Sequence, residues 1–187
     1  MGFTLLETTR LRLRRFTEAD LPTLIAYRRD PETRRFQNFC EWTEQDRHDF
    51  LSGAQMAELD ALGKGLQIAV ALRETDALIG DVYVRIPDAE QAEIGYTFDP
   101  AQRDQGYATE AVSGLFTYLF DELGLHRIVA ICAIDNTRSY ALMERIGMRR
   151  EAHMQQSYRY NGVWCDEFAY AMLNEDWQRM NNSSVSA

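Results

Sequence analysis

Cysteine and histidine are scarce in this sequence, and the few present show no metal-binding or disulfide pattern. The chain has 187 residues with three cysteines and three histidines. These residues are Cys40, Cys132 and Cys165, and His48, His126 and His153. The cysteines are odd in number and far apart, which excludes a disulfide framework, and neither residue type has the spacing of a zinc or redox site. We therefore expect no metal site.

Long apolar runs are missing as well. No stretch approaches the roughly 20 apolar residues that span a bilayer, and the first residues lack a basic region followed by an apolar core. We expect no contact with a membrane and interpret the protein as cytoplasmic.

Positive charge is in short supply, with 20 basic against 29 acidic residues and a formal net charge of -9. This charge repels a polyanion, and the arginines are scattered evenly, so nucleic acid is not expected as a partner. The same acidity would favour a cationic partner such as an amine or a basic peptide, although excess acid also serves solubility.

The apolar pattern predicts a single α+β domain, since 45% of the residues are hydrophobic and the length suits one core. Alternating apolar residues indicate strands, and a three-four spacing indicates helices. The expected strands are 9–16, 66–72, 78–86, 92–98, 127–133, 154–160 and 163–173, and the expected helices are 17–29, 43–62, 108–120 and 136–146. This gives a mixed, mostly antiparallel sheet of about seven strands with about four helices. Residues 1–180 form the predicted domain, and 181–187 form a polar tail predicted to be disordered.

A loop of small residues, 103–111, joins the strand at 92–98 to the following helix. Asp99 and Pro100 break the strand, and Gly106 and Ala108 leave room beside the backbone. The first N–H groups of a helix lack intrahelical partners and lie at the positive end of its dipole, so such a loop is a ready site for phosphate. A glycine before a helix is also common in plain turns. The buried apolar stripe of the helix favours the phosphate site, because it fixes the helix and with it the loop.

Three motifs, in this order, resemble the GNAT acetyltransferases, most closely the RimJ/RimL-like branch of ribosomal-protein N-terminal acetyltransferases. They are Glu93-Ile94-Gly95-Tyr96, then Arg103-x-x-Gly106-x-Ala108, then Asn136-x-x-Ser139 followed by Gly147-Met148. The opening segment 9–14 and the closing hairpin with Asn161-Gly162 are similar to that branch too. The resemblance therefore covers nearly the whole chain and implies the GNAT fold.

The resemblance implies acetyl-coenzyme A as the donor. Its pyrophosphate would lie on the N–H groups of 103–108, its pantetheine arm along the strand that ends at Phe98, and its thioester carbonyl near the backbone N–H of Tyr96. Arg138 and Arg145 could reach the 3′-phosphate or be solvated helix arginines, and Tyr107 could simply pack the loop. The predicted cofactor-binding residues are Tyr96, Thr97, Phe98, Arg103, Asp104, Gln105, Gly106, Tyr107, Ala108, Thr109, Asn136 and Ser139.

Glu93 is the predicted general base. An amine with a pKa of about 10 is mostly protonated at neutral pH and must lose a proton before it attacks, so a carboxylate, directly or through water, is the natural base. Alternation places Glu93 on the strand face opposite the apolar row. The alternative is a solvated or structurally hydrogen-bonded carboxylate.

Ser139 is the predicted proton donor to the departing thiolate, or a partner of the coenzyme sulfur. Many family members have a tyrosine seven positions after the asparagine, where this chain has Met143, whereas the RimJ/RimL-like branch has a serine near the sulfur that Ser139 matches. The spacing of Asn136 and Ser139 equally suits a helix cap. Asp104 also departs from the family, because a carboxylate beside a pyrophosphate is unfavourable unless it points to solvent.

Three aromatic residues, Tyr27, Phe36 and Trp42, come from the region that forms the acceptor wall in this family, and with Glu93 they are the predicted acceptor-binding residues. Their rings could sandwich a substrate chain or an ammonium group, or form core between two helices. Cys132 lies in an apolar run, where it is a small buried hydrophobe or a nucleophile.

We therefore expect an N-acetyltransferase in which a primary amine attacks acetyl-coenzyme A directly, the amine being a protein N-terminus or a small molecule. The alternative, suggested by Met143 and Asp104, is a non-catalytic acetyl-coenzyme A-binding module. A phosphate-loop hydrolase is excluded, because the loop has no Gly-Lys-Ser/Thr ending. The edge strands of such a sheet make a homodimer reasonable.

Overall fold

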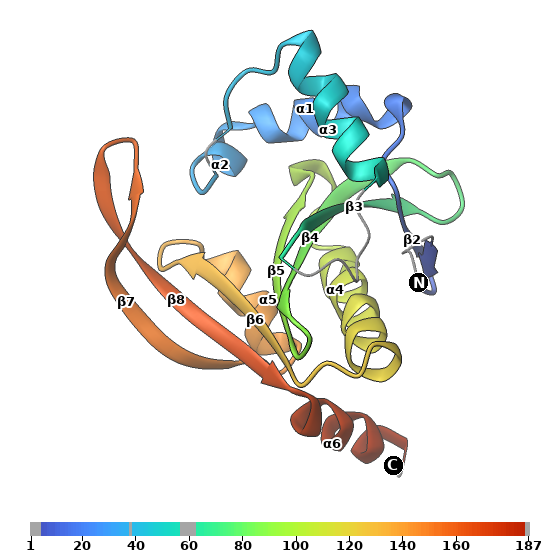
Figure 1. The fold of residues 1–187 in the computed structure, drawn as a ribbon, viewed down its shortest axis with the longest axis vertical. Helices are drawn as coiled ribbons and strands as arrows, with labels where there is room; N and C mark the ends of the chain where they lie inside the picture. The colour runs from blue at the N-terminus through green and yellow to red at the C-terminus, as the bar shows by residue number, and fades with distance from the viewer. Residues whose placement is uncertain (1–4, 38, 57–62, 186–187) are drawn as a thin grey trace.

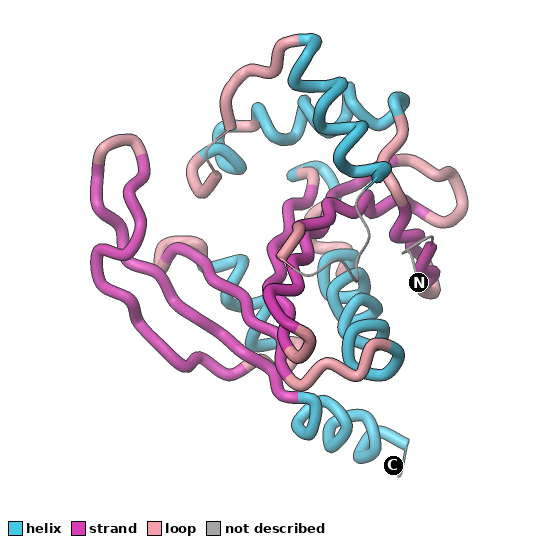
Figure 2. Tube along the Cα trace, in the orientation of Figure 1, coloured by secondary structure: helices cyan, strands magenta, loops and turns pink. Residues whose placement is uncertain are grey.

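The computed structural model describes residues 5–37, 39–56 and 63–185, which form an eight-stranded sheet flanked by helices (Figures 1 and 2). The order across the sheet is β1-β2-β3-β4-β5-β6-β8-β7, and every neighbouring pair is antiparallel except β5 and β6, which are parallel. The strands are β1 Leu5–Glu7, β2 Leu11–Arg14, β3 Gly65–Leu72, β4 Leu78–Asp88, β5 Gln91–Phe98, β6 Arg127–Ala133, β7 Arg149–Tyr160 and β8 Val163–Leu173.

Six α-helices lie within the described ranges. They are α1 Leu21–Arg29, α2 Pro31–Arg34, α3 Glu44–Met56, α4 Tyr107–Thr117, α5 Thr137–Arg145 and α6 Asn174–Val185. In Figure 1, α1, α2 and α3 gather at the top of the molecule, and the long β7–β8 hairpin projects at the left. None of the helices among the described residues is long and apolar enough to cross a membrane.

The main core lies between one face of the sheet and the helices α4 and α5. Ala111, Val112 and Leu115 of α4 are completely buried in it, as the predicted stripe requires. A π turn at Tyr118–Glu122 follows α4, and Gly124 leaves the helix with a φ of 68°, the left-handed conformation expected of a glycine stop. The packing of α4 fixes the loop that precedes it.

A smaller core lies on the opposite face, where α1 and α3 cover β3 and the start of β4. Leu24 and Tyr27 of α1 pack there against Phe16 and Ala69. Because these helices stop short of β6, the outer face of β6 stays open and Ile131 is 43% exposed. The mostly apolar sequence of 127–133 predicts a strand buried on both sides, and this prediction is wrong because helices cover only one face of β6.

The α+β class is confirmed, with one strand and two helices more than predicted. The strand predicted at 9–16 is β2, and β1 pairs with it. Asp30 ends α1 as predicted but also begins α2, because its Oδ1 accepts from the backbone N–H of Glu32 at 3.0 Å and Thr33 at 3.1 Å. The helix predicted at 43–62 is α3, with 57–62 outside the described residues.

The additional C-terminal helix is α6, which continues to Val185 where the sequence predicts a disordered tail from residue 181. Trp177 is buried, with its ring centroid 5.9 Å from Phe116 and 6.0 Å from Phe120. Core packing offsets the unfavourable nucleation of the helix, and adding further residues costs little. Residues 186–187 lie outside the described range.

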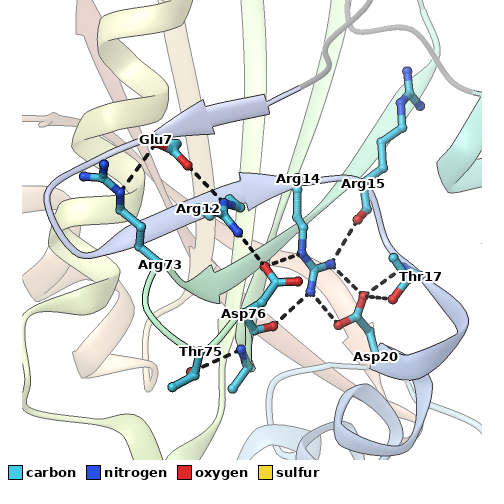
Figure 3. A network of polar contacts seen from close by, with 10 residues as sticks. Glu7, Arg12, Arg14, Arg15, Thr17, Asp20, Arg73, Thr75 and Asp76 are labelled. Atoms are coloured by element: carbon cyan, nitrogen blue, oxygen red, sulfur yellow. Dashed lines mark hydrogen bonds and ion pairs between the residues drawn. The ribbon is translucent and has the colours of Figure 1, made fainter.

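A network of arginines and carboxylates fixes the start of α1 (Figure 3). The Arg14 guanidinium on β2 donates to both carboxylate oxygens of Asp20, at 2.7 and 2.9 Å, and to Asp76 at 3.1 Å. Asp20 also accepts from the Thr17 backbone N–H at 2.8 Å. These bonds tie the chain before α1 to β2 and to the turn after β3.

Candidate active site

The parallel strands β5 and β6 separate part-way along their length. Their register pairs Gln91–Ile94 with Arg127–Ala130 and ends there, although both strands continue. On its other side β5 stays paired with β4 as far as Phe98. Residues 95–98 therefore present a backbone edge without a neighbouring strand, which an extended ligand can join by hydrogen bonds.

The loop before α4 has the geometry of an anion site. Asp104 and Gly106 both adopt left-handed conformations, with φ of 62° and 77°, and Gly106 caps α4. The backbone N–H groups of 104–109 donate to no acceptor within the described part of the chain. Alternating backbone handedness followed by a helix N-terminus gathers such groups into a concavity for an anion.

Arg10 supports this loop from outside, a role that the sequence analysis missed. Its guanidinium donates to the Gln105 carbonyl oxygen at 3.0 Å and to Glu110 at 2.6 Å, and it lies 4.6 Å from the centre of the Tyr107 ring. Thr8 adds a hydroxyl bond of 2.6 Å to Glu110. These contacts join residues about one hundred positions apart, so no local pattern could have revealed them.

The loop opens onto a cleft of about 800 Å³ between the free edge of β5, α2 and the start of α5. The cleft brings together all the predicted cofactor-binding residues except Gln105, which points its carbonyl at Arg10. Arg103, Arg138 and Arg145 line it and supply positive charge. A second hollow of about 810 Å³, between α1 and α3, contains none of the predicted site residues.

Glu32 on α2 forms hydrogen bonds with two arginines that line the cleft, and the sequence did not indicate these contacts. Its Oε2 accepts from Nη1 of Arg103 and, at 3.3 Å, from Nη1 of Arg138. The hydrogen bond and charge of Arg103 hold the pKa of Glu32 below its usual value. The carboxylate thus forms ion pairs with two arginines that line the cleft of the proposed anion site.

At the bottom of the cleft, Tyr96 and Ser139 join β5 to α5. The Tyr96 hydroxyl donates to the Ser139 carbonyl oxygen at 2.9 Å and lies 3.0 Å from Ser139 Oγ. Asn136 caps α5 by accepting from the Ser139 N–H at 3.2 Å. The predicted cap is therefore confirmed, and it uses only the backbone of Ser139. The hydroxyl of Ser139 faces Tyr96, whose pKa burial raises above its usual value.

Cys132 lies beside Ser139 but is buried in the main core. Burial raises the pKa of its thiol to about 11, although a bond with Ser139 opposes this. The group is therefore a neutral thiol at physiological pH and a poor nucleophile. Met143, at the position of the missing tyrosine, is buried in the same core.

Glu93 does not line the cleft. It lies opposite Arg85 in the β4–β5 register and forms an ion pair with that guanidinium. Alternation along β5 puts Glu93, Gly95 and Thr97 on the face covered by α1, with Glu93 about 13 Å from Thr97 along the strand. The structure thus places Glu93 on the expected strand face, but outside the cleft and paired with Arg85.

The predicted acceptor residues separate into two groups. Phe36 lines the cleft, with the Arg35 guanidinium 5.2 Å from its ring centre. Tyr27 is only 2% exposed and donates its hydroxyl to Asp81 at 2.5 Å. The Trp42 ring packs 4.9 Å from Phe50 against the smaller core. Of the three aromatic residues, only Phe36 lines the cleft.

The family model described as "Acetyltransferase (GNAT) domain" matches residues 10–149. The chain belongs to this family. The uncharacterized N-acetyltransferase YnaD of Bacillus subtilis is 33% identical over 171 residues, covering 91% of this chain and 97% of that protein. A solved GNAT-family acetyltransferase from Bacillus anthracis is 31% identical, with a TM-score of 0.81, covering 92% of this chain and 99% of that one. The protein is thus an acetyl-coenzyme A-dependent acetyltransferase of the GNAT family.

Relatives include ribosomal-protein N-acetyltransferases, in agreement with the predicted RimJ/RimL-like branch. The putative ribosomal N-acetyltransferase YdaF of Bacillus subtilis is 35% identical over 88 residues, which cover 47% of this chain and 48% of that protein. The match is confined to about half of each GNAT chain, so it identifies a relative rather than an acceptor.

Proposed function

We propose that this GNAT protein transfers the acetyl group of acetyl-coenzyme A to a primary amine, with the α-amine of a protein N-terminus as the first acceptor class to test. The observation that carries the proposal is the row of N–H groups at 104–109, which have no acceptor among the described residues and open onto a cleft beside the free edge of β5. A diphosphate fits the N–H groups, an amide-containing arm fits the strand edge, and the arginines at the mouth fit a further phosphate.

Acetyl-coenzyme A supplies an acetyl group activated as a thioester. Backbone N–H groups beside Tyr96 are suited to stabilise the oxygen that gains negative charge during attack. The nitrogen–carbon bond forms as the carbon–sulfur bond breaks, and no acyl-enzyme is required. The raised pKa of Cys132 supports direct attack, because it leaves the nearby thiol protonated.

Two protons must move. We propose that Ser139 Oγ, backed by the Tyr96 hydroxyl 3.0 Å away, gives its proton to the departing thiolate and recovers one from the attacking nitrogen, which must lose a second proton once it is acylated. We propose that Glu93 accepts the ammonium proton through water. Its carboxylate must then exchange its hydrogen bond with Arg85 for one with that water. Glu93 lies on the same strand face as Thr97, which lines the cleft, so water must carry the proton over the roughly 13 Å between them.

The test is a thiol-release assay with acetyl-coenzyme A and a panel of free N-terminal peptides, polyamines and aminoglycosides. Ser139→Ala should lower kcat by about a hundredfold with unchanged coenzyme A affinity, because only the proton donor is lost. Glu93→Gln should lower turnover mainly at low pH, where most of the amine is protonated. An unaffected rate in either variant would return that residue to a structural role.

The non-catalytic alternative predicts coenzyme A binding without turnover of any amine in this panel. Met143 and Asp104 motivate that alternative, but the Ser139–Tyr96 pair offers another proton source. A cytoplasmic location and a homodimer stay predictions.

A further inference from the structure

Asp81 is a carboxylate buried in the sheet, outside the cleft. It lies on β4, is 1% exposed, and accepts hydrogen bonds from three side chains. These are the Tyr27 hydroxyl at 2.5 Å, Nη2 of Arg28 at 3.0 Å and Nε2 of Gln67. Two of the donors belong to α1 and one to β3, so the carboxylate connects α1 to the sheet.

Burying a charged carboxylate at this position costs free energy, because the charge loses its hydration. Desolvation makes a buried ion pair less stabilising than apolar residues of similar volume in many proteins, and burial raises the pKa of Asp81 despite its three donors. Leu78 on the same strand packs in the smaller core with Leu24 and Tyr27 of α1, so apolar residues are accommodated on this face of the sheet. Hydrogen bonds in fixed directions define a position more sharply than apolar packing does.

The position that Asp81 defines lies next to the free edge of β5. Its cross-strand neighbour is Thr97, which is buried and accepts a bond from the Gln37 side chain. Adjacent residues of β4 and β5 therefore hold α1 at one point and the chain after α2 at another. The segment between these two anchors carries Thr33 and Phe36, which line the cleft.

We propose that Asp81 is a positioning residue for the acceptor. It holds α1 through Tyr27 and Arg28. It thereby fixes the position, relative to the thioester, of residues 32–37, which form one wall of the cleft. Asp81 touches neither the cleft nor a reacting atom, so it acts through this wall. The proposal rests on the proposed function, because it assumes that an amine enters between this wall and β5. It also gives Tyr27 a supporting role in place of direct contact with the acceptor.

Asp20 provides a matched control. It is the other buried carboxylate among the described residues, at 5% exposure, and it holds the same helix at its opposite end through Arg14 (Figure 3). A general loosening of α1 or a loss of stability would follow from Asp20→Asn as well as from Asp81→Asn. Only the Asp81 substitution acts beside Thr97.

The experiment compares steady-state kinetics of the full chain and both variants, with acetyl-coenzyme A and whichever free N-terminal peptide the wild type acetylates best. Asp81→Asn should raise KM for the peptide about tenfold, with the Kd for coenzyme A within twofold of the wild type. Asp20→Asn should lower Tm and leave the peptide KM unchanged. An unchanged KM in Asp81→Asn, or an equal rise in both variants, would overturn the proposal.

Two further measurements keep the outcome decisive. Tyr27→Phe removes a single hydroxyl, so it should fold even if Asp81→Asn does not, and it should raise the peptide KM severalfold. Amide exchange in α1 should increase near residues 25–29 in Asp81→Asn and in Tyr27→Phe, but not in α4. If the wild type acetylates no amine, the proposed function fails, and unchanged exchange in α1 would then separately reject Asp81 as its anchor.

Discussion

Asp20 and Asp81 are both buried carboxylates bonded to an arginine, yet their environments shift the pKa in opposite directions. Burial raises the pKa of Asp20, but hydrogen bonds from Arg14 and Thr17 outweigh it, and the pKa is lowered overall. For Asp81 complete burial outweighs its donors, and the pKa is raised. A residue's neighbours, rather than its identity, decide whether its charge stabilises the fold.

These shifts predict opposite pH profiles of stability. A lowered pKa stabilises the fold above the unfolded-state value of about 3.9, and this contribution is lost as pH falls through the folded-state pKa. Asp20→Asn should therefore cost about 2 kcal/mol at pH 7 and less below pH 4. For Asp81 the wild type should gain stability relative to Asp81→Asn as pH falls toward 4. Urea unfolding from pH 3 to 7 measures both, and parallel profiles would contradict the assignment.

Asp104 is a second residue-scale feature with a measurable consequence. Its φ of 62° is unfavourable for a side chain, and it carries negative charge on the cleft that we assign to a diphosphate. Asp104→Gly should tighten coenzyme A binding severalfold, because it removes both the charge and the strain. Asp104→Asn removes only the charge and should recover part of the gain. Titration calorimetry gives both values, and weaker binding in Asp104→Gly would show that the side chain supports the loop.

The backbone conformation of single residues could be predicted from the sequence where a local rule applies. Gly106, Asn136 and Gly124 all have the caps and turns that their types favour. Asp81 carried a signal too, as a carboxylate within the mostly apolar run 78–84 of β4, but its partners come from α1 and β3. Long-range pairs of this kind have no local pattern.

At the scale of elements, the loop before α4 depends on the β1–β2 turn. Arg10 contacts the loop carbonyl, the Tyr107 ring and Glu110 of α4. The N–H groups of this loop can bind an anion without reorganisation only while these contacts hold their orientation.

Arg10→Ala should therefore weaken coenzyme A binding about tenfold and increase amide exchange in 104–109. Arg12→Ala is the control, since Arg12 lies two residues further along, on β2, and pairs with Glu7 and Asp76 away from the loop. Both variants lose a cation and surface ion pairs. Equal affinity loss in the two would show a general charge effect instead of support for the loop.

The order of elements was largely predictable from the sequence, whereas which strand faces the helices cover was not. Periodicity identified α4, β5 and the β7–β8 hairpin, whose Asn161 and Gly162 both have the positive φ of the expected turn. It overestimated the burial of β6, because an apolar strand sequence does not reveal which face a helix covers. It missed α2 and α6, since four residues are too few to show a period and the stability of α6 comes from Trp177.

At the scale of the whole molecule, the cleft is spanned by contacts between its two sides. Glu32 on α2 reaches Arg103 and Arg138, and the Tyr160 hydroxyl at the tip of β7 donates to the Arg34 carbonyl oxygen. The helices α1–α3 and the β7–β8 hairpin are thereby connected across the site.

The Glu32 contact must compete with bound phosphate for the same cations. Glu32→Gln should tighten coenzyme A binding severalfold at low salt, and the gain should shrink at high salt, where ion pairs are screened. Glu41→Gln is the control, because Glu41 pairs with Arg29 away from the cleft. A gain that does not depend on salt would contradict an electrostatic competition.

The last helix of the structure also bears on how the chain is made. Trp177 packs against Phe116 and Phe120, so the part of these rings that it covers stays exposed on a growing polypeptide until α6 has been synthesised. During translation, the apolar side of α4 is therefore a surface that a chaperone could bind, and this part of the core closes only after α6 leaves the ribosome.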